Sequence, residues 1–144
     1  ISFAEFMDLA LYAPGLGYYS AGVAKFGIDG DFVTAPLISS LFSQALGAQC
    51  AQILRLLDEP MILELGAGTG RMACDIMRYL AEQSCLPQQY IILEVSADLR
   101  ARQQTYLQQH CNALYDRFIW LDRLPDKPFQ GVILGNEVID ALPV

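Results

Sequence analysis

The sequence contains a single histidine, His110, and its four cysteines include no CxxC pair. Zinc sites and redox-active dithiols need clustered Cys and His ligands at short spacing, so we expect no metal site. We expect four reduced thiols, several of them buried, as in a cytosol-like compartment. His110 falls at the end of a predicted helix, where a cation is favoured without any catalytic role.

Long apolar runs and clusters of basic residues are also missing. No stretch reaches the roughly 18 apolar residues that a membrane span needs, and the N-terminus lacks the basic start and apolar block of a secretion signal. Charged residues make up only 17% of the chain, the net charge is −7, and the nine Lys and Arg residues are scattered. We therefore expect no membrane span and no nucleic-acid partner.

The rest of the composition is that of a folded domain. Hydrophobic residues make up 53% of the 144 residues and the mean hydropathy is +0.30, which is enough to bury a sizeable core. Because the first residue is Ile1 and not methionine, we expect the chain to be cut from a longer protein.

Hydrophobic periodicity alternates between short apolar runs and helical patterns. The alternation predicts an α/β fold with a parallel sheet flanked by helices, because parallel strands are buried on both faces. A capping box at Ser2 and Glu5 opens the first helix, to about Leu11, and residues 15–36 are interpreted as a loop containing at most a short strand. The other predicted helices span residues 39–57, 71–83 and 97–110, and the predicted strands span residues 61–65, 90–95, 118–121 and 131–134. The helix over 39–57 is expected to bury Leu41, Phe42, Ala45, Leu46, Ile53, Leu54 and Leu57.

A glycine-rich loop joins the first predicted strand to the helix that follows it. Gly66, Gly68 and Gly70 form a GxGxG pattern with Glu64 just before it. Dinucleotide folds use GxGxxG to approach a pyrophosphate, which a carboxylate at Glu64 would repel. S-adenosylmethionine carries an ammonium group, a sulfonium and no phosphate, so this loop favours it over NAD.

A second carboxylate, Glu94, comes at the end of the next predicted strand. A carboxylate at this distance after the glycines binds ribose hydroxyls in nucleotide folds, and the alternative is a solvent-exposed strand-end residue. Leu121 and Asp122, at the end of the third strand, are expected to meet the adenine. Trp120 is interpreted as a core residue.

These segments resemble the class I methyltransferase core and, within it, the MidA family, whose mitochondrial relatives assemble respiratory complex I. The resemblance rests on ELGAGTG at 64–70, GDFVTAP at 30–36, LEVS at 93–96 and NEVIDALPV at 136–144, together with LY at 11–12 and GYYS at 17–20. It implies a Rossmann-like methyltransferase core, here cut after the fourth strand, and S-adenosyl-L-methionine as the cofactor. The expected cofactor-binding residues are Glu64, Gly66, Ala67, Gly68, Gly70, Glu94, Val95, Leu121, Asp122, Asp31 and Thr34. Asp31 either reaches the amino end of the cofactor or bonds its own turn backbone.

The resemblance also implies a protein substrate, with arginine methylation of a complex I subunit as the relatives' chemistry. The expected catalytic residues are Asn136, Glu137 and Asp140, whose carboxylates suit a guanidinium and its proton. For Asp140 the alternative is a helix-capping role.

Residues 1–57 are expected to pack on the cofactor site and residues 58–144 to form the first half of the core, within one domain. Two other functions stay open at this point. A dinucleotide oxidoreductase would require GxGxxG, and a non-catalytic assembly protein would keep the fold without turnover. A bacterial protein of this kind is expected in the cytoplasm, and a eukaryotic one in the mitochondrial matrix.

Overall fold

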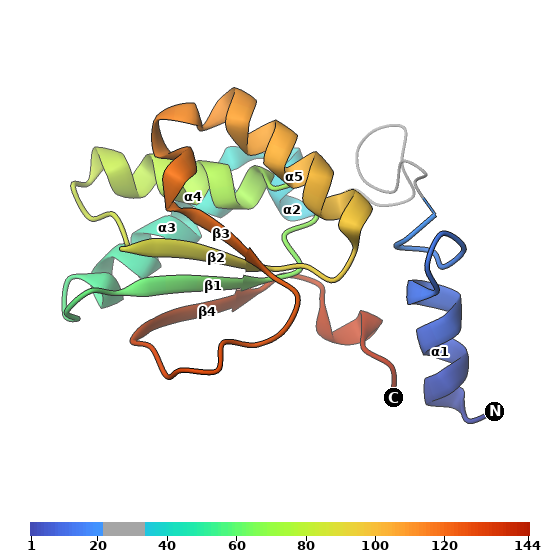
Figure 1. Ribbon diagram of the computed structural model, residues 1–144. Coiled ribbons are helices and arrows are strands. Elements are labelled where there is room, and N and C mark those ends of the chain that lie inside the picture. Colours follow the sequence, from blue (N-terminus) through green and yellow to red (C-terminus); the bar gives the residue numbers. More distant parts are fainter. Residues whose placement is uncertain (22–33) are drawn as a thin grey trace.

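The computed structural model describes residues 1–21 and 34–144, and its centre is a four-stranded parallel sheet in the order β3–β2–β1–β4 (Figure 1). The strands are β1 (Met61–Leu65), β2 (Gln89–Leu93), β3 (Phe118–Leu121) and β4 (Gly131–Gly135). The helices are α1 (Phe3–Tyr12), α2 (Ala35–Ile38), α3 (Ser40–Leu54), α4 (Arg71–Glu82) and α5 (Ala97–His110), with 3₁₀ turns η1 (Asn112–Arg117) and η2 (Ile139–Ala141). The predicted Rossmann-like α/β fold class is confirmed.

The strand register brings the carboxyl ends of the strands to one edge. Leu65, at the end of β1, pairs with Leu93 of β2 and with Gly135 of β4, and Leu93 pairs in turn with Leu121 of β3. The segments that follow these strands therefore start side by side. Ligands of open parallel sheets bind at this edge.

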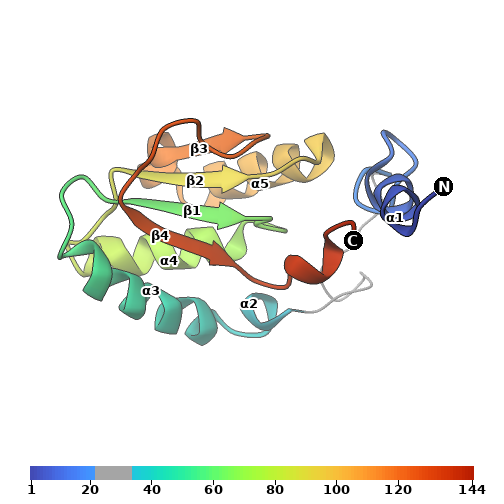
Figure 2. The same ribbon diagram turned by 90° about the horizontal axis from the view of Figure 1, so that it is seen from below.

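The helices α3, α4 and α5 cover the same face of the sheet, as the two views show (Figure 2). The main core lies between that face and the helices, and includes Ile62, Ile76, Leu80 and Ile92. The central strands β1 and β2 each bury three consecutive residues, which explains why both strands are mostly apolar in the sequence, with Glu64 as the exception in β1.

The predicted buried face of α3 is partly wrong. Leu41 is 71% exposed and Ile53 is 44% exposed, whereas α3 buries the small residues Ser43, Gly47 and Cys50. A Cβ atom on Gly47 would stand 3.0 Å from the Tyr79 ring of α4. The close approach of α3 to α4 therefore selects small side chains over leucine at the helix contact.

The N-terminal region contains one helix that the sequence predicts and one that the sequence analysis missed. The predicted capping box is confirmed, because Ser2 Oγ accepts a hydrogen bond from the Glu5 backbone N–H and Glu5 Oε2 accepts one from the Ser2 backbone N–H. The short α2 begins inside the segment interpreted as a loop, with Pro36 in its first turn.

In the described ranges, no helix is both long and apolar enough to cross a membrane. All four cysteines are free thiols, as predicted.

Candidate active site

A cavity lies at the carboxyl edge of the sheet, where the loops after β1, β2 and β4 meet. Its walls come from these three loops, from the first turns of α4 and α5, from α2, and from the segment that follows α1. The lining residues are Tyr12, Tyr19, Thr34, Pro36, Leu37, Glu64, Gly66, Ala67, Gly68, Thr69, Met72, Glu94, Leu99, Asn136, Glu137, Val138, Asp140 and Ala141.

The glycine loop adopts a backbone that other residues rarely adopt. Gly66, Gly68 and Gly70 have φ values of 61°, 54° and 81°, a left-handed region that costs a side chain about 1 kcal/mol or more. A Cβ on Gly66 would also approach Val138 to 3.2 Å. Gly70 then caps α4, which brings the unpaired N–H groups of a helix start to the loop.

Glu64 is buried on β1 and lines the cavity, with only 1% of its surface exposed. The Tyr90 hydroxyl on β2 donates a hydrogen bond of 2.8 Å to Glu64 Oε2. Burial raises the pKa of Glu64 to about 7, against the opposing effect of the Tyr90 hydrogen bond. Because burial disfavours the ionised form of Glu64, a cationic group of a ligand at the cavity wall would stabilise that form and is favoured there.

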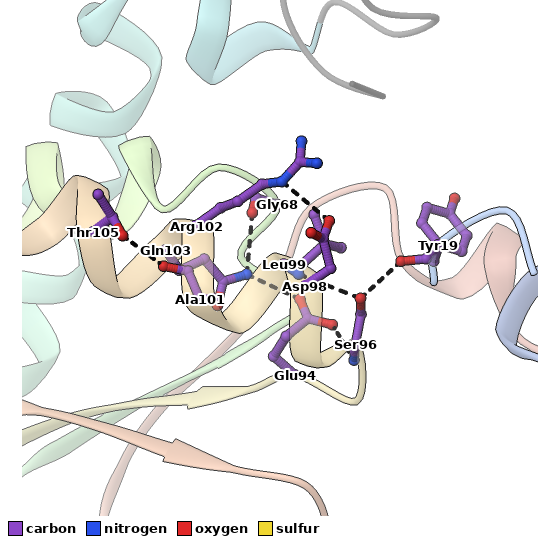
Figure 3. Close-up of polar contacts among 10 residues, drawn as sticks. All are labelled: Tyr19, Gly68, Glu94, Ser96, Asp98, Leu99, Ala101, Arg102, Gln103 and Thr105. Carbon is purple, nitrogen blue, oxygen red and sulfur yellow. Dashed lines mark hydrogen bonds and ion pairs between the residues drawn. The ribbon is translucent and has the colours of Figure 1, made fainter. Parts of the chain in front are cut away.

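Glu94 directly follows β2, is buried and lines the cavity, and Figure 3 shows its hydrogen bonds. Its Oε1 accepts a 2.9 Å hydrogen bond from the Ser96 backbone N–H, and its Oε2 accepts one of 2.9 Å from Gln103 Nε2. Burial raises the pKa of Glu94, while these two donors lower it. The structure thus contradicts the alternative of a solvent-exposed Glu94.

The segment after β4 carries the three predicted catalytic residues, and all three line the cavity. Asn136 Nδ2 lies 3.5 Å from Glu137 Oε1. Glu137 has a φ of 52°, which is uncommon for a residue with a side chain. Asp140 lies within the 3₁₀ turn η2. The exposed carboxyl groups of Glu137 and Asp140 thus stand at the open side of the cavity.

The N-terminal segment contributes two tyrosines to the cavity. The Tyr12 hydroxyl donates a 2.7 Å hydrogen bond to the Ala141 carbonyl, and the rings of Tyr12 and Tyr19 stack with centroids 5.6 Å apart. Ser96 Oγ donates a 2.7 Å hydrogen bond to the Tyr19 carbonyl. The α1 segment is therefore tied to both the β2 and β4 loops.

Replacing Tyr12 with phenylalanine is expected to loosen this attachment by about 1 kcal/mol, because one partly buried hydrogen bond is lost while the ring stack stays. Hydrogen–deuterium exchange across α1 should accelerate about fivefold, with α4 unchanged as an internal reference. Tyr19→Phe is the matched control, since the Tyr19 contact with Ser96 uses the backbone carbonyl. Equal exchange in wild type and Tyr12→Phe would contradict the proposed anchoring.

Sequence reasoning located half of the residues that line the cavity. Gly70, Val95, Leu121 and Asp122 are predicted cofactor residues that do not line the cavity, and their contact with a ligand stays a prediction. Asp31 lies outside the described residues. The residues that reasoning from spacing missed are Tyr12, Tyr19, Pro36, Leu37, Thr69, Met72, Leu99, Val138 and Ala141. Most of them lie within the motifs that carry the family resemblance, and only Leu37, Met72 and Leu99 lie outside those motifs.

The lining is electrostatically one-sided. It contains four carboxyl groups, those of Glu64, Glu94, Glu137 and Asp140, and no Lys, Arg or His side chain from the described part of the chain. A phosphate-bearing ligand would meet only like charges from these side chains. A ligand with cationic groups and free hydroxyls fits these four carboxyl groups, which attract cations and accept hydrogen bonds from hydroxyls.

Comparison with known families agrees with this geometry. A family model described as "Putative S-adenosyl-L-methionine-dependent methyltransferase" matches residues 45–144. The chain belongs to this family. The matched region runs from within α3 to the segment after β4 and so includes the glycine loop and all four strands.

Individual relatives of the family extend the likeness to the N-terminal segment. The mitochondrial protein arginine methyltransferase NDUFAF7 of Danio rerio is 30% identical over 100% of this chain and 39% of its own length. The homolog in Drosophila melanogaster is 32% identical over 100% of this chain and 38% of its own length. The chain therefore spans about two fifths of these curated relatives. The predicted resemblance to the MidA-type methyltransferases is confirmed.

A solved relative shares the fold in detail. A crystal structure of a protein from Burkholderia thailandensis bound to S-adenosyl-homocysteine is 44% identical, with a TM-score of 0.91, over 99% of this chain and 38% of that one. A second crystal structure from the same organism is 43% identical with a TM-score of 0.85.

Proposed function

We propose that this chain forms the cofactor-binding part of an S-adenosylmethionine-dependent methyltransferase that acts on protein arginine. The observation that carries the proposal is the left-handed glycine loop between two buried carboxyls, Glu64 and Glu94, in a cavity without basic side chains from the described residues. The relative crystallised with S-adenosyl-homocysteine supports the cofactor, and the relatives named protein arginine methyltransferases support the substrate class.

The residues fit the cofactor because glycines leave room where side chains would crowd the loop, as the 3.2 Å approach of a Gly66 Cβ to Val138 shows. In this proposal Glu94 accepts hydrogen bonds from ribose hydroxyls and Glu64 faces a cationic group. When bound, S-adenosylmethionine supplies an activated methyl group, so the protein mainly orients the partners and excludes water.

Glu137 and Asp140 are the proposed substrate residues. Their exposed carboxyl groups hold a guanidinium at the open side of the cavity. When the guanidinium nitrogen takes the methyl group from the sulfonium, S-adenosylhomocysteine would leave and one of these carboxylates would accept the proton that the nitrogen loses. Asn136 lies beside Glu137 and orients its carboxyl group.

The proposal extends to the whole protein in three respects. Residues 1–57 close the cofactor side, and residues 58–144 form the first half of the core. The partner is a protein substrate, with a respiratory complex I subunit as the specific candidate. The proposed location is the mitochondrial matrix for a eukaryotic protein, in line with the mitochondrial names of the relatives, and the cytoplasm for a bacterial one.

The direct test is calorimetric titration of the full-length protein with S-adenosylmethionine, S-adenosylhomocysteine and NAD. We expect saturable heat from the first two and none from NAD. Absence of heat from S-adenosylmethionine would overturn the cofactor assignment, and NAD binding alone would favour an oxidoreductase.

The substrate class needs a second measurement. Labelled methyl transfer into cell extract, followed by acid hydrolysis, should yield methylated arginine. Methyl-lysine as the labelled product would contradict the arginine assignment. Cofactor binding without any labelled product would favour the non-catalytic assembly role.

A further inference from the structure

Four glutamines lie on α5, and the chain buries one of them. Gln103 is fully buried, with 0% exposure, while Gln108 and Gln109 on the same helix are exposed. A buried amide is costly unless its donors and acceptor are paired. The position of Gln103 therefore points to specific partners.

Both polar atoms of the Gln103 side chain are hydrogen-bonded, and Figure 3 shows the two partners of Nε2. Nε2 donates to the Gly68 carbonyl at 3.1 Å and to Glu94 Oε2 at 2.9 Å. Oε1 accepts from Trp120 Nε1 on β3 at 3.1 Å. The amide thus joins the glycine loop, the residue after β2, and β3.

Chemistry allows one orientation of this amide. An indole N–H only donates, whereas a carbonyl and a carboxylate only accept. If the amide were turned over, its oxygen would face Gly68 and Glu94, and its nitrogen would face the Trp120 donor. Trp120 therefore fixes the orientation of the Gln103 amide. This orientation directs the Nε2 group toward the two acceptors, Glu94 Oε2 and the Gly68 carbonyl.

The backbone of α5 also lies close to the loop. A Cβ added to Gly70 would lie 3.5 Å from the Gln103 Cα and 3.6 Å from the Gln103 Cβ, which are ordinary van der Waals distances. Gln103 thus bonds the loop through its side chain, and its backbone lies within about one methyl group of Gly70.

We propose that Gln103 is a positioning residue. Trp120 holds its amide, and the amide holds the Glu94 carboxyl group and the glycine loop in the arrangement that binds the ribose of the cofactor. The inference rests on the proposed function, in which Glu94 binds the ribose. Gln103 does not line the cavity itself, so it acts through these two partners.

The first test removes the amide but keeps the chain length, in Gln103→Met of the full-length protein. We expect S-adenosylhomocysteine to bind about tenfold more weakly, because a hydrogen bond to a charged group is lost. Gln108→Met, at an exposed position of the same helix, is the matched control and should bind like wild type. Unchanged affinity of Gln103→Met would overturn the proposal.

A double-mutant cycle separates positioning from a merely structural effect. In a Glu94→Ala background, Gln103→Met should cost less than about threefold, since Glu94 is gone and only the contact with the Gly68 carbonyl remains. A full tenfold loss in that background would show that Gln103 acts independently of Glu94 and would overturn the proposal.

The readout that does not depend on cofactor binding is the Glu94 carboxyl pKa, followed by carbon NMR in the ligand-free protein. Loss of the Gln103 donor should raise it, and Trp120→Phe should raise it by a smaller amount through the released amide. Trp120→Phe also serves if Gln103→Met fails to fold. An unchanged Glu94 pKa in the folded variants would overturn the inference, whereas a wild type that binds no S-adenosylhomocysteine would overturn the proposed function instead.

Discussion

Replacing Glu94 with alanine is expected to weaken S-adenosylhomocysteine binding by about 100-fold or more. A carboxylate that accepts from ribose hydroxyls makes charge-assisted hydrogen bonds, each worth about 1.5–3 kcal/mol. The substitution also removes the acceptor for Gln103 Nε2 and for the Ser96 N–H, both of which are buried. Isothermal titration calorimetry of the full-length protein measures the change.

Two further variants sharpen this result. Glu94→Gln keeps the side-chain shape and one acceptor, so we expect a smaller loss of about tenfold. Glu82→Ala removes an exposed carboxylate from α4 and should leave binding unchanged. If Glu94→Ala binds within about threefold of wild type while remaining folded, Glu94 is not the ribose acceptor.

The sheet could be predicted from the sequence because its signals are local. Residues 61–65 form a short apolar run with one carboxylate, followed by glycine, and β1 has the same bounds. The second strand runs from Gln89 to Leu93, not from 90 to 95, so Glu94 follows β2 and is free to turn toward Ser96. Strand ends are set by hydrogen bonding between strands, which a single sequence does not encode.

The parts of the site that could not be predicted depend on long-range contacts. The Tyr12 hydroxyl bonds Ala141, 129 residues away, and no local pattern announces that contact. Gln103 looks like its neighbouring glutamines in the sequence, and only its burial and its bonds to Gly68, Glu94 and Trp120 distinguish it. On α3, packing against Tyr79 overrode the expectation that leucines face inward.

The second large effect concerns Glu64 and the pH dependence of stability. Burial raises the pKa of Glu64 in the folded protein from 4.5 to about 7. Between these values the folded chain binds a proton that the unfolded chain has released. The stability contributed by protonated Glu64 is therefore full below pH 4.5 and is lost as pH rises through about 7.

Glu64→Gln removes this titration while leaving an oxygen that accepts from the Tyr90 hydroxyl. One pKa unit corresponds to about 1.4 kcal/mol. The free energy of unfolding of the variant minus that of wild type should therefore increase by roughly 3 kcal/mol as pH rises from about 4.5 to about 8. Urea denaturation of the full-length protein at several pH values measures this gain. Glu82→Gln, at an exposed carboxylate, is the control and should show no such trend.

Ligand binding should also change the protonation of the Glu64 carboxyl group. A cationic group beside Glu64 favours its ionised form, so S-adenosylmethionine binding near pH 6 should release a proton from wild type and weaken as pH falls below about 7. Calorimetry in buffers of different ionisation enthalpy counts that proton, and Glu64→Gln should release fewer. Equal proton release by both proteins, together with a stability difference that does not change with pH, would mean that Glu64 stays ionised and that its carboxylate is stabilised by partners other than Tyr90.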